Sequence, residues 1–380
     1  MSSLLRHATG FFSGLASRRY GPIGLHMARE AIHLVQFDSH AGRIVAVRGW
    51  ASVQLPQGDA EWDSPKRLAL LLRKAFVSAG FKGKRVVSAM PHSKVRIHSV
   101  TYRPTRERSA PNEILHLMQE RLDGELADHV LDFLPVREGA PDGERLALVA
   151  VSRREDVVAH LELLRRAGLD VEALEVGPTA IRRLVCALSP AGEPENVLVL
   201  NAGDTASFMT MISGRRLLFD QEVDFGERKL VELVAKSLDM PEQIVRDVVA
   251  KGGLDEASSR ALQDVNLASA IVEILRPELK RLVAELERAF LYASSETRGG
   301  GAKRVFLAGS LARWPGADRQ LAAIARLPVT NIPDPLAVLA PEARRVVPAH
   351  AVPEIAVAAG LALRGVAAEK DETVAAAGGS

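Results

Sequence analysis

The chain has 380 residues, 47% of them apolar and 25% charged, which is enough to bury the cores of two ordinary domains. Its net charge of +2 excludes a nucleic-acid binder that works through bulk positive charge. The single cysteine, Cys186, excludes an internal disulfide and favours a reducing compartment, so we expect a cytoplasmic protein.

The N-terminal segment 1–21 predicts an arm rather than a signal peptide, because Arg6, His7 and Gly10 interrupt any apolar core. Apolar residues fall near one helical face of this arm, with basic residues available for lipid headgroups: Leu4, Leu5, Ala8, Phe11, Phe12 and Leu15, with Arg6, Arg18 and Arg19. A peripheral membrane contact is one interpretation, and a frayed or partner-docked end is the one we favour. The sequence contains no run of ~20 apolar residues, so it predicts no helix that spans a membrane.

Two parts of the sequence open in the same way, which indicates an internal duplication. The first runs strand 23–27, strand 32–37, a turn at 38–42 and strand 43–53, then a helix over 64–79 and the strand "KRVVSAMP". The second runs "NVLVLNAGDTASFMTMISGRRLLFDQEVDFG" over 196–226, then a helix over 268–294 and the strand "KRVFLAGS". Each copy predicts a mixed sheet with a crossover helix.

Other segments have no counterpart in the opposite copy. The first copy contains an α/β insert over about 96–176, with helices at 112–124 and 154–167 and strands at 146–152 and 170–175. The second contains a mainly helical subdomain over about 227–300, in which Pro277 should kink or break the long helix. The Pro- and Gly-rich stretch 188–196 divides the chain into lobes 22–190 and 191–366, and the polar tail 367–380 is expected to be disordered.

The ordered set of segments resembles the actin-like ATPases, and within them the PilM-type pilus assembly proteins, relatives of the cell-division protein FtsA. The matching segments are "IGLHMAREAIHLVQF", "LDFLPV", "LALVAVSRREDVVAHLELLRRAGLDVEALEVGPTAIRRL", "NVLVLNAGDTASFMTMISGRRLLFDQEVDFGERKL", "RVFLAGSLARWPG" and "VPEIAVAAGLALR". The resemblance implies an α/β, duplicated actin-like (ribonuclease H-like) fold. It also implies that the last of these segments forms a closing helix packed across the domains.

The same resemblance implies a function. Such proteins are cytoplasmic scaffolds at the inner membrane of a type IV or MSHA-type pilus machine. They bind the short N-terminal cytoplasmic peptide of a bitopic membrane partner, PilN, in a groove beside the inserted subdomain. The sequence marks no individual groove residue, and self-association stays open. No nucleic-acid partner is expected.

Three loops that hold Mg-ATP in this fold depart from the family pattern here. In the first, Gly24 to Ala28, His26 replaces an acid, Ala28 a glycine, His33 a lysine, and bulky Arg29 and Glu30 follow. In the second, Asn201 replaces an aspartate, while Gly203 and Thr205 remain. In the third, Gly309-Ser310-Leu311 replaces three glycines, and Leu311 would close the space for a base or ribose.

We therefore expect no ATP hydrolysis and no cofactor. Gly203, Asp204, Thr205, Gly309 and Ser310 would form a residual nucleotide site, but tight turns between strands explain them better, with Asp204 a solvated turn acid. An active ATP-binding ATPase of the same machinery is the alternative. A sugar kinase would need an intact phosphate loop, which the sequence lacks. A type II secretion L-type component would need a membrane-spanning helix, which the sequence does not predict.

The ten histidines show no metal-ligand spacing, so no metal site is predicted. His26 and His33 lie on consecutive strands and would face each other across the hairpin, which we attribute to chance. Trp314 and Pro315 are expected to anchor a turn against the core.

Overall fold

A computed structural model gives the three-dimensional structure and describes residues 19–28, 31–40, 43–55, 64–105, 109–137, 143–189, 196–254, 265–296, 301–341, 348 and 351–364. Most of the predicted arm and the whole predicted tail lie outside these residues; β1 begins at Arg19, inside the predicted arm. Within the described part of the chain, no helix is both long and apolar enough to cross a bilayer.

Two five-stranded sheets have the same strand order, which confirms the predicted duplication. The first sheet is β3-β2-β1-β4-β8, built from β1 (Arg19–Met27), β2 (Ala31–His40), β3 (Arg43–Gln54), β4 (Arg85–Ala89) and β8 (Asp170–Glu175). The second is β11-β10-β9-β12-β13, built from β9 (Asn196–Ala202), β10 (Ser207–Ser213), β11 (Arg216–Val223), β12 (Arg304–Gly309) and β13 (Val329–Asn331). In each, an antiparallel meander is followed by a parallel strand, β4 beside β1 and β12 beside β9.

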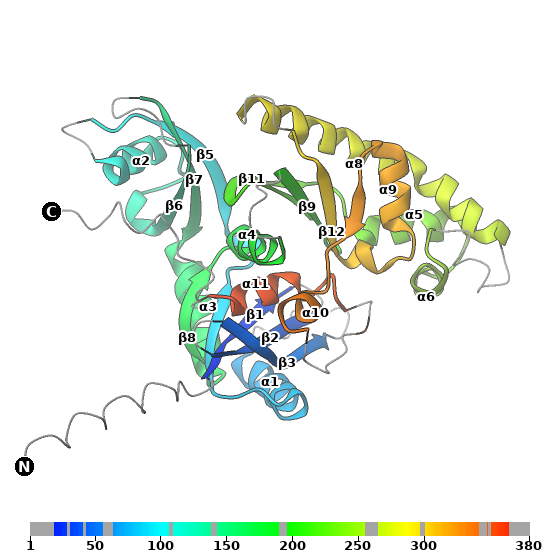
Figure 1. The fold of residues 1–380 in the computed structure, drawn as a ribbon, viewed down its shortest axis with the longest axis horizontal. Helices are drawn as coiled ribbons and strands as arrows, with labels where there is room; N and C mark the ends of the chain where they lie inside the picture. The colour runs from blue at the N-terminus through cyan, green and yellow to red at the C-terminus, as the bar shows by residue number, and fades with distance from the viewer. Residues whose placement is uncertain are drawn as a thin grey trace, which may run out of the picture.

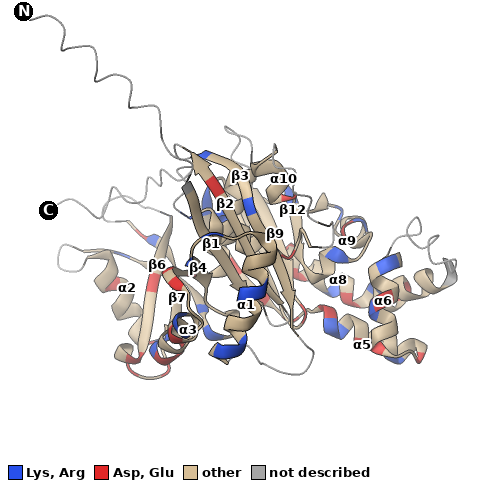
Figure 2. Ribbon diagram, turned by 90° about the horizontal axis from the view of Figure 1, so that it is seen from below, with Lys and Arg blue, Asp and Glu red and all other residues tan. Residues whose placement is uncertain are grey.

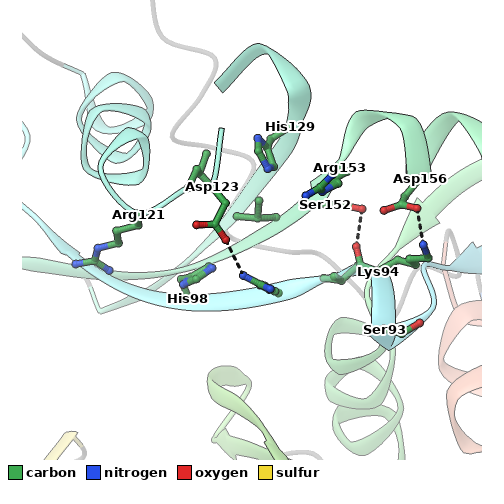
Figure 3. A pocket seen from close by; sticks show the side chains of 13 residues that line it. Ser93, Lys94, His98, Arg121, Asp123, His129, Ser152, Arg153 and Asp156 are labelled. Carbon is green, nitrogen blue, oxygen red and sulfur yellow. Dashed lines mark hydrogen bonds and ion pairs between the residues drawn. The ribbon is translucent and has the colours of Figure 1, made fainter. Parts of the chain in front are cut away.

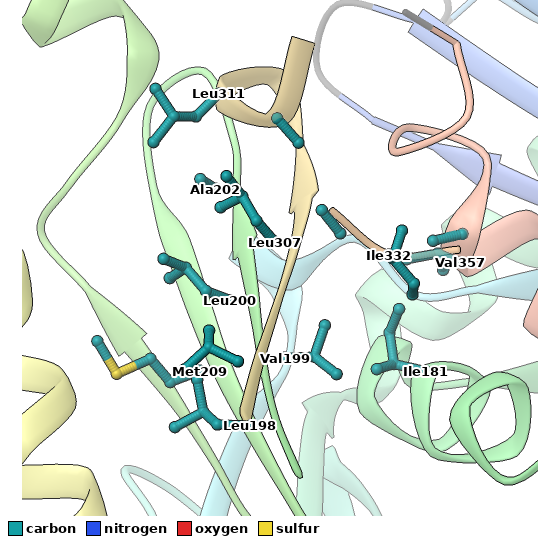
Figure 4. Packing of buried hydrophobic residues seen from close by; sticks show 14 of the residues in the cluster. Ile181, Leu198, Val199, Leu200, Ala202, Met209, Leu307, Leu311, Ile332 and Val357 are labelled. Atoms are coloured by element: carbon teal, nitrogen blue, oxygen red, sulfur yellow. The ribbon is translucent and has the colours of Figure 1, made fainter. Parts of the chain in front are cut away.

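Burial explains why these segments are strands. The first eight residues of β2 are all buried. In β9, four consecutive apolar residues are buried. Central strands covered on both faces have this character, whereas half-exposed strands alternate. In the second lobe, side chains of Leu198, Leu200, Met209 and Leu307 pack together between the sheet and its helices (Figure 4).

The inserted subdomain has a sheet of its own, β5-β7-β6, formed by β5 (Arg96–Tyr102), β6 (His129–Arg137) and β7 (Arg145–Arg153). Helix α2 (Ala110–Gln119) covers it through Ile114 and Met118, giving a small separate core. Strand β8 lies within the range predicted for the insert, yet it pairs with β4 in the first sheet. Helix α3 (Arg154–Arg166) connects β7 to β8 (Figure 1).

The remaining helices cover the two main sheets. They are α1 (Pro65–Ala79), α4 (Gly177–Leu188), α5 (Glu227–Leu238), α6 (Glu242–Gly252), α8 (Val265–Glu296), α9 (Ala317–Ala325), α10 (Pro335–Leu339) and α11 (Ala356–Ala362), with short 3-10 turns at His92–Lys94, Leu126–Asp128 and Ser310–Arg313. Helix α8 runs through Pro277 as one helix, so of the two predicted alternatives, a kink or a break, the break is wrong. Pro277 has no N–H to donate to the carbonyl of Glu273. Both residues are exposed, so water can satisfy that carbonyl.

The closing helix α11 lies in the first lobe, against β1 and α4 (Figure 1). Two glycines allow this close packing: a Cβ on Gly24 would lie 2.0 Å from the Ala358 carbonyl oxygen, and one on Gly360 would lie 2.1 Å from that of Ala180. Any larger residue at either position would push backbone against backbone. The chain therefore returns from the second lobe to the first before it forms α11.

Candidate functional site

The second and third predicted loops meet at the carboxyl ends of two parallel strands. The register pairs Ala308 with Asn201 and Gly309 with Ala202, so Gly309 and Ser310 lie beside the loop that begins at Gly203. The structure thus brings the predicted residues together at the sheet edge where this kind of fold binds ligands.

The second loop is a tight turn seated on the start of α5. The Gly203 N–H donates to the Ala206 carbonyl at 3.1 Å, and the Gly203 carbonyl accepts from the Glu227 N–H at 3.0 Å. The Asp204 carbonyl accepts from the Arg228 N–H at 2.9 Å. Backbone N–H groups at a helix start are a natural phosphate site. Here loop carbonyls already occupy two of them.

Asp204 is buried rather than solvated, so the prediction of a solvated turn acid is wrong. Its side chain is 5% exposed, with Oδ2 2.7 Å from Arg228 Nη2 and Oδ1 4.0 Å from Arg246 Nη1. Helices α5 and α6 supply these two arginines, and the sequence around Asp204 does not predict them as its partners. The carboxylate is held in an internal ion pair instead of facing a cation site. Thr205, by contrast, is exposed.

The third loop is packed into the second lobe. Gly309 has φ of 80°, and a Cβ there would lie 2.4 Å from the Ala202 carbonyl oxygen and 2.6 Å from Asn201 Oδ1. The Ser310 hydroxyl donates to the Ala202 carbonyl at 3.1 Å. Leu311 is fully buried in the hydrophobic core of this lobe (Figure 4).

A buried glutamate next to these loops was missed from the sequence. Glu227 is 3% exposed and accepts from Arg313 Nη2 at 2.8 Å and from Trp314 Nε1 at 2.9 Å. Arg313 also pairs with Glu354 at 3.2 Å. The expected anchoring of Trp314 against the core is confirmed, since the residue is 2% exposed. Its indole and Arg313 fix the third loop to the start of α5.

In the first loop, His26 and His33 do face each other, with ring centroids 5.8 Å apart in a stacked arrangement. Both Nδ1 atoms are buried without a hydrogen-bond partner among the described residues. Burial lowers the pKa of His33 to about 4, with the Arg313 charge adding to the effect. Burial, with His33 and His92, also lowers the pKa of His26 well below its usual value. Both rings are therefore neutral at neutral pH.

A stacked ring pair joins the lobes beside this loop. His92, in the turn after β4, stacks on Phe208 of β10 with ring centroids 3.7 Å apart and 19° between the planes. Burial lowers the pKa of His92 to about 4, so this imidazole is neutral as well. This contact could not be predicted from the sequence, because its two residues lie far apart in the chain and belong to different lobes.

These contacts do not fit a magnesium-bound triphosphate. Within Gly24 to Ala28, Asn201 to Thr205 and Gly309 to Leu311, Asp204 is the one carboxylate, and arginines face both of its oxygens. Hydrated Mg²⁺ in such sites is held through carboxylates, and a neutral imidazole contributes no negative charge. In the described part of the chain, His, Cys, Asp and Glu form no group of three or more suited to a metal ion.

A cavity of about 160 Å³ lies on the inserted subdomain, where the segment after β4 enters it (Figure 3). Its charged lining residues are Lys94, Arg96, Arg121, Asp123, Arg153 and Asp156, with His98, His129, Ser93 and Ser152. Lys94 Nζ lies 2.8 Å from Asp156 Oδ1, and the Ser152 hydroxyl donates to the Lys94 carbonyl at 2.7 Å. Arg96 and Asp123 pair more loosely at 3.6 Å.

The cavity has cations in excess among its lining residues, and these cations are exposed. Arg96 and Arg121 are exposed, and Arg121 Nη1 donates to the Ser99 carbonyl at 3.2 Å. Carboxylates and backbone carbonyls are the groups that such arginines bind best. None of these residues was predicted, because they come from four separate segments without a shared motif.

Comparison with known proteins gives a family match over most of the chain. The model of the family described as "Type IV pilus assembly protein PilM" matches residues 24–366. A search of curated proteins gives no match.

Solved structures show the same fold. One, titled "PilM-PilN type IV pilus biogenesis complex", has a TM-score of 0.73 at 24% identity, covering 91% of this chain and 98% of that one. The ethanolamine utilization protein EutJ from Carboxydothermus hydrogenoformans has a TM-score of 0.51 at 15% identity, covering 91% and 90%. With the duplicated sheets, these likenesses confirm the predicted two-lobed α/β actin-like fold.

Proposed function

The chain belongs to the family of type IV pilus assembly protein PilM, and from this premise we propose that it is a scaffold that binds the N-terminal cytoplasmic segment of a PilN-like bitopic protein. It works in the cytoplasm, peripheral to the inner membrane. A protein of the same fold is described in its complex with PilN, which supports a partner of this kind.

The cavity beside the insert is the observation that carries the proposal. It is lined by Ser93 and Lys94 from the first lobe and by residues of β5 and β7 in the insert. A segment bound there would contact both subdomains at once. Its carboxylates and carbonyls would meet Arg96 and Arg121, which carry only weak or backbone contacts in the free protein.

The same proposal makes the protein a scaffold rather than an ATPase. The support comes from the loops: Asp204 is engaged by Arg228, Ser310 by the Ala202 carbonyl, and His26 is a neutral imidazole in place of an acid. Asp204 and Ser310, two polar groups that the fold could turn toward a metal-bound triphosphate, are thus used in internal contacts. Binding of Mg-ATP with micromolar affinity would support the active ATPase instead.

Titration calorimetry of the full chain with synthetic N-terminal peptides of candidate bitopic pilus proteins tests the proposal. We expect one peptide to bind, and Arg121→Glu to weaken it about tenfold or more, the worth of one charge-assisted contact. Arg165→Glu is the matched control, because Arg165 is exposed on α3 and does not line the cavity. Equal loss in both variants, or no binding by any peptide, would refute the cavity as the docking site.

A further inference from the structure

The outward face of α1 combines positive charge with exposed apolar side chains. Leu68, Leu72 and Ala75 point into the first-lobe core. The opposite stripe of the helix, at helical spacing, carries Lys66, Leu70, Arg73, Lys74 and Val77, all exposed. Leu70 is 53% exposed and Val77 is 80% exposed, which is unusual for aliphatic residues.

No acidic residue occurs anywhere from Ser64 to Thr105, although basic residues are frequent there. Figure 2 shows basic but no acidic positions along α1. The acids that precede the helix in sequence, Asp59, Glu61 and Asp63, lie outside the described residues. Since the whole chain has a net charge of only +2, the positive charge of this face is a local feature.

The turn that follows α1 carries further exposed basic residues. Lys82 and Lys84 are exposed, and the ring of Tyr20 lies against Gly83, where a Cβ would be 3.0 Å from the ring. Tyr20 is itself 44% exposed. It follows Arg19, the first residue of β1, so β1 begins beside this turn.

We propose that this basic face, formed by α1 and the turn at 80–84, rests on a membrane surface rich in anionic phospholipids. Lysine and arginine would lie at the headgroups, with Leu70, Val77 and the Tyr20 ring at the level where apolar and aromatic side chains enter the interface. Nucleic acid would use the charge but leave the aliphatic residues unpartnered, so lipid fits the observed combination better. The inference rests on the proposed function, which places the protein beside a membrane-anchored partner.

Flotation of the full chain with lipid vesicles tests this face. We expect binding to phosphatidylcholine vesicles that contain about 30% phosphatidylglycerol, weak binding to phosphatidylcholine alone, and release by about 0.5 M salt. The triple variant Lys66→Glu, Arg73→Glu, Lys74→Glu should lower the partition coefficient about a hundredfold or more, because the loss of each basic residue lowers it about fivefold. Leu70→Ser with Val77→Ser should also lower it, because these side chains would no longer enter the apolar part of the interface.

A matched triple variant controls for total charge. Lys236, Lys251 and Lys280 are exposed lysines of the second lobe, and their replacement by Glu should leave at least half of the vesicle binding. Equal loss in both triple variants, or equal binding to neutral and anionic vesicles, would overturn the proposal. So would binding to duplex DNA in the absence of vesicle binding, which would assign the face to nucleic acid.

The peptide titration separates this proposal from the proposed function. The α1 triple variant should bind the partner peptide with unchanged affinity, and Arg121→Glu should float with vesicles as the unchanged chain does. Peptide binding without vesicle binding would overturn the lipid face alone, whereas vesicle binding without peptide binding would overturn the docking function alone. A circular dichroism spectrum of each variant confirms that it is folded.

Discussion

The loop after β1 and the loop after β9 occupy equivalent places in two sheets of identical strand order, but they differ in chemistry. In the first, His26 and His33 are neutral rings with buried Nδ1 atoms, beside the stack of His92 on Phe208. In the second, Gly203 and Asp204 are bound to the start of α5 by backbone hydrogen bonds and an ion pair. Strand order therefore depends on the apolar pattern of the strands, while the loops between them take unrelated contacts.

A second difference between the lobes is the way their central strands are covered. Gly24 of β1 takes the α11 backbone directly against it, whereas Val199 of β9 presents a buried side chain to the core. The first lobe is thereby closed by a helix that arrives from the end of the chain. This makes the first lobe dependent on the second, and the expected effects of substitutions follow from that asymmetry.

The largest effect is expected at Gly24. Gly24→Ala would place a methyl group 2.0 Å from the Ala358 carbonyl oxygen, and neither backbone can move without separating α11 from β1. We expect a loss of about 3 kcal/mol or more in the free energy of unfolding, measured by urea denaturation. Gly301→Ala is the control, because a Cβ there would meet only the rotatable side-chain hydroxyl of Ser294, at 3.1 Å. A stable Gly24→Ala protein would contradict the packing.

Asp204 should come second, as a structural group rather than a metal ligand. Asp204→Asn removes the charge that faces Arg228 and Arg246, and we expect a loss of about 2 kcal/mol, limited by the partial exposure of Arg228. Thermal unfolding with and without magnesium measures it. If the acid were a metal ligand, magnesium would stabilise the unchanged chain but not the variant, which our account does not allow.

Acid should destabilise the protein through its buried histidines. The pKa values of His33 and His92 lie near 4 in the folded chain, below the usual value near 6.5 when unfolded, so the unfolded state binds more protons between these values. Stability is complete above pH of about 6.5 and falls as the pH drops toward about 4. His92→Gln should flatten this slope by up to about 1.4 kcal/mol per pH unit. His116→Gln, at an exposed position, should leave it unchanged.

Thr205 should give the smallest effect. Its side chain is exposed, and Thr205→Ala should change the free energy of unfolding by less than about 0.5 kcal/mol. The affinity for the partner peptide should also stay the same, since Thr205 does not line the cavity on the insert. A tenfold loss of peptide affinity in this variant would connect the loop to docking and contradict the separation of the two sites.

The local elements could be predicted where short-range chemistry fixes them. The helix predicted over 64–79 is found as α1, between Pro65 and the left-handed cap Gly80, and the strands of both meanders are confirmed. The long helix was predicted, but Pro277 does not break it, because its exposed side tolerates the missing hydrogen bond.

Long-range pairing could not be predicted in the same way. Strand β8 was predicted as part of the insert, because nothing in the sequence of Asp170–Glu175 specifies β4 as its neighbour. The ion pairs of Asp204, the stack of His92 on Phe208 and the cavity arginines join residues far apart in sequence. A polar residue in a turn looks solvated until the helices that cover it are known. The predicted nucleotide residues were brought together, but their binding of a nucleotide stays a prediction.

The most direct test of the account is a titration of the full chain with a fluorescent ATP analogue in the presence of magnesium, followed by anisotropy. The account predicts no saturable binding up to about 1 mM analogue, because the loop groups are engaged in internal contacts. Saturable, magnesium-dependent binding in the micromolar range, displaced by unlabelled ATP, would contradict it.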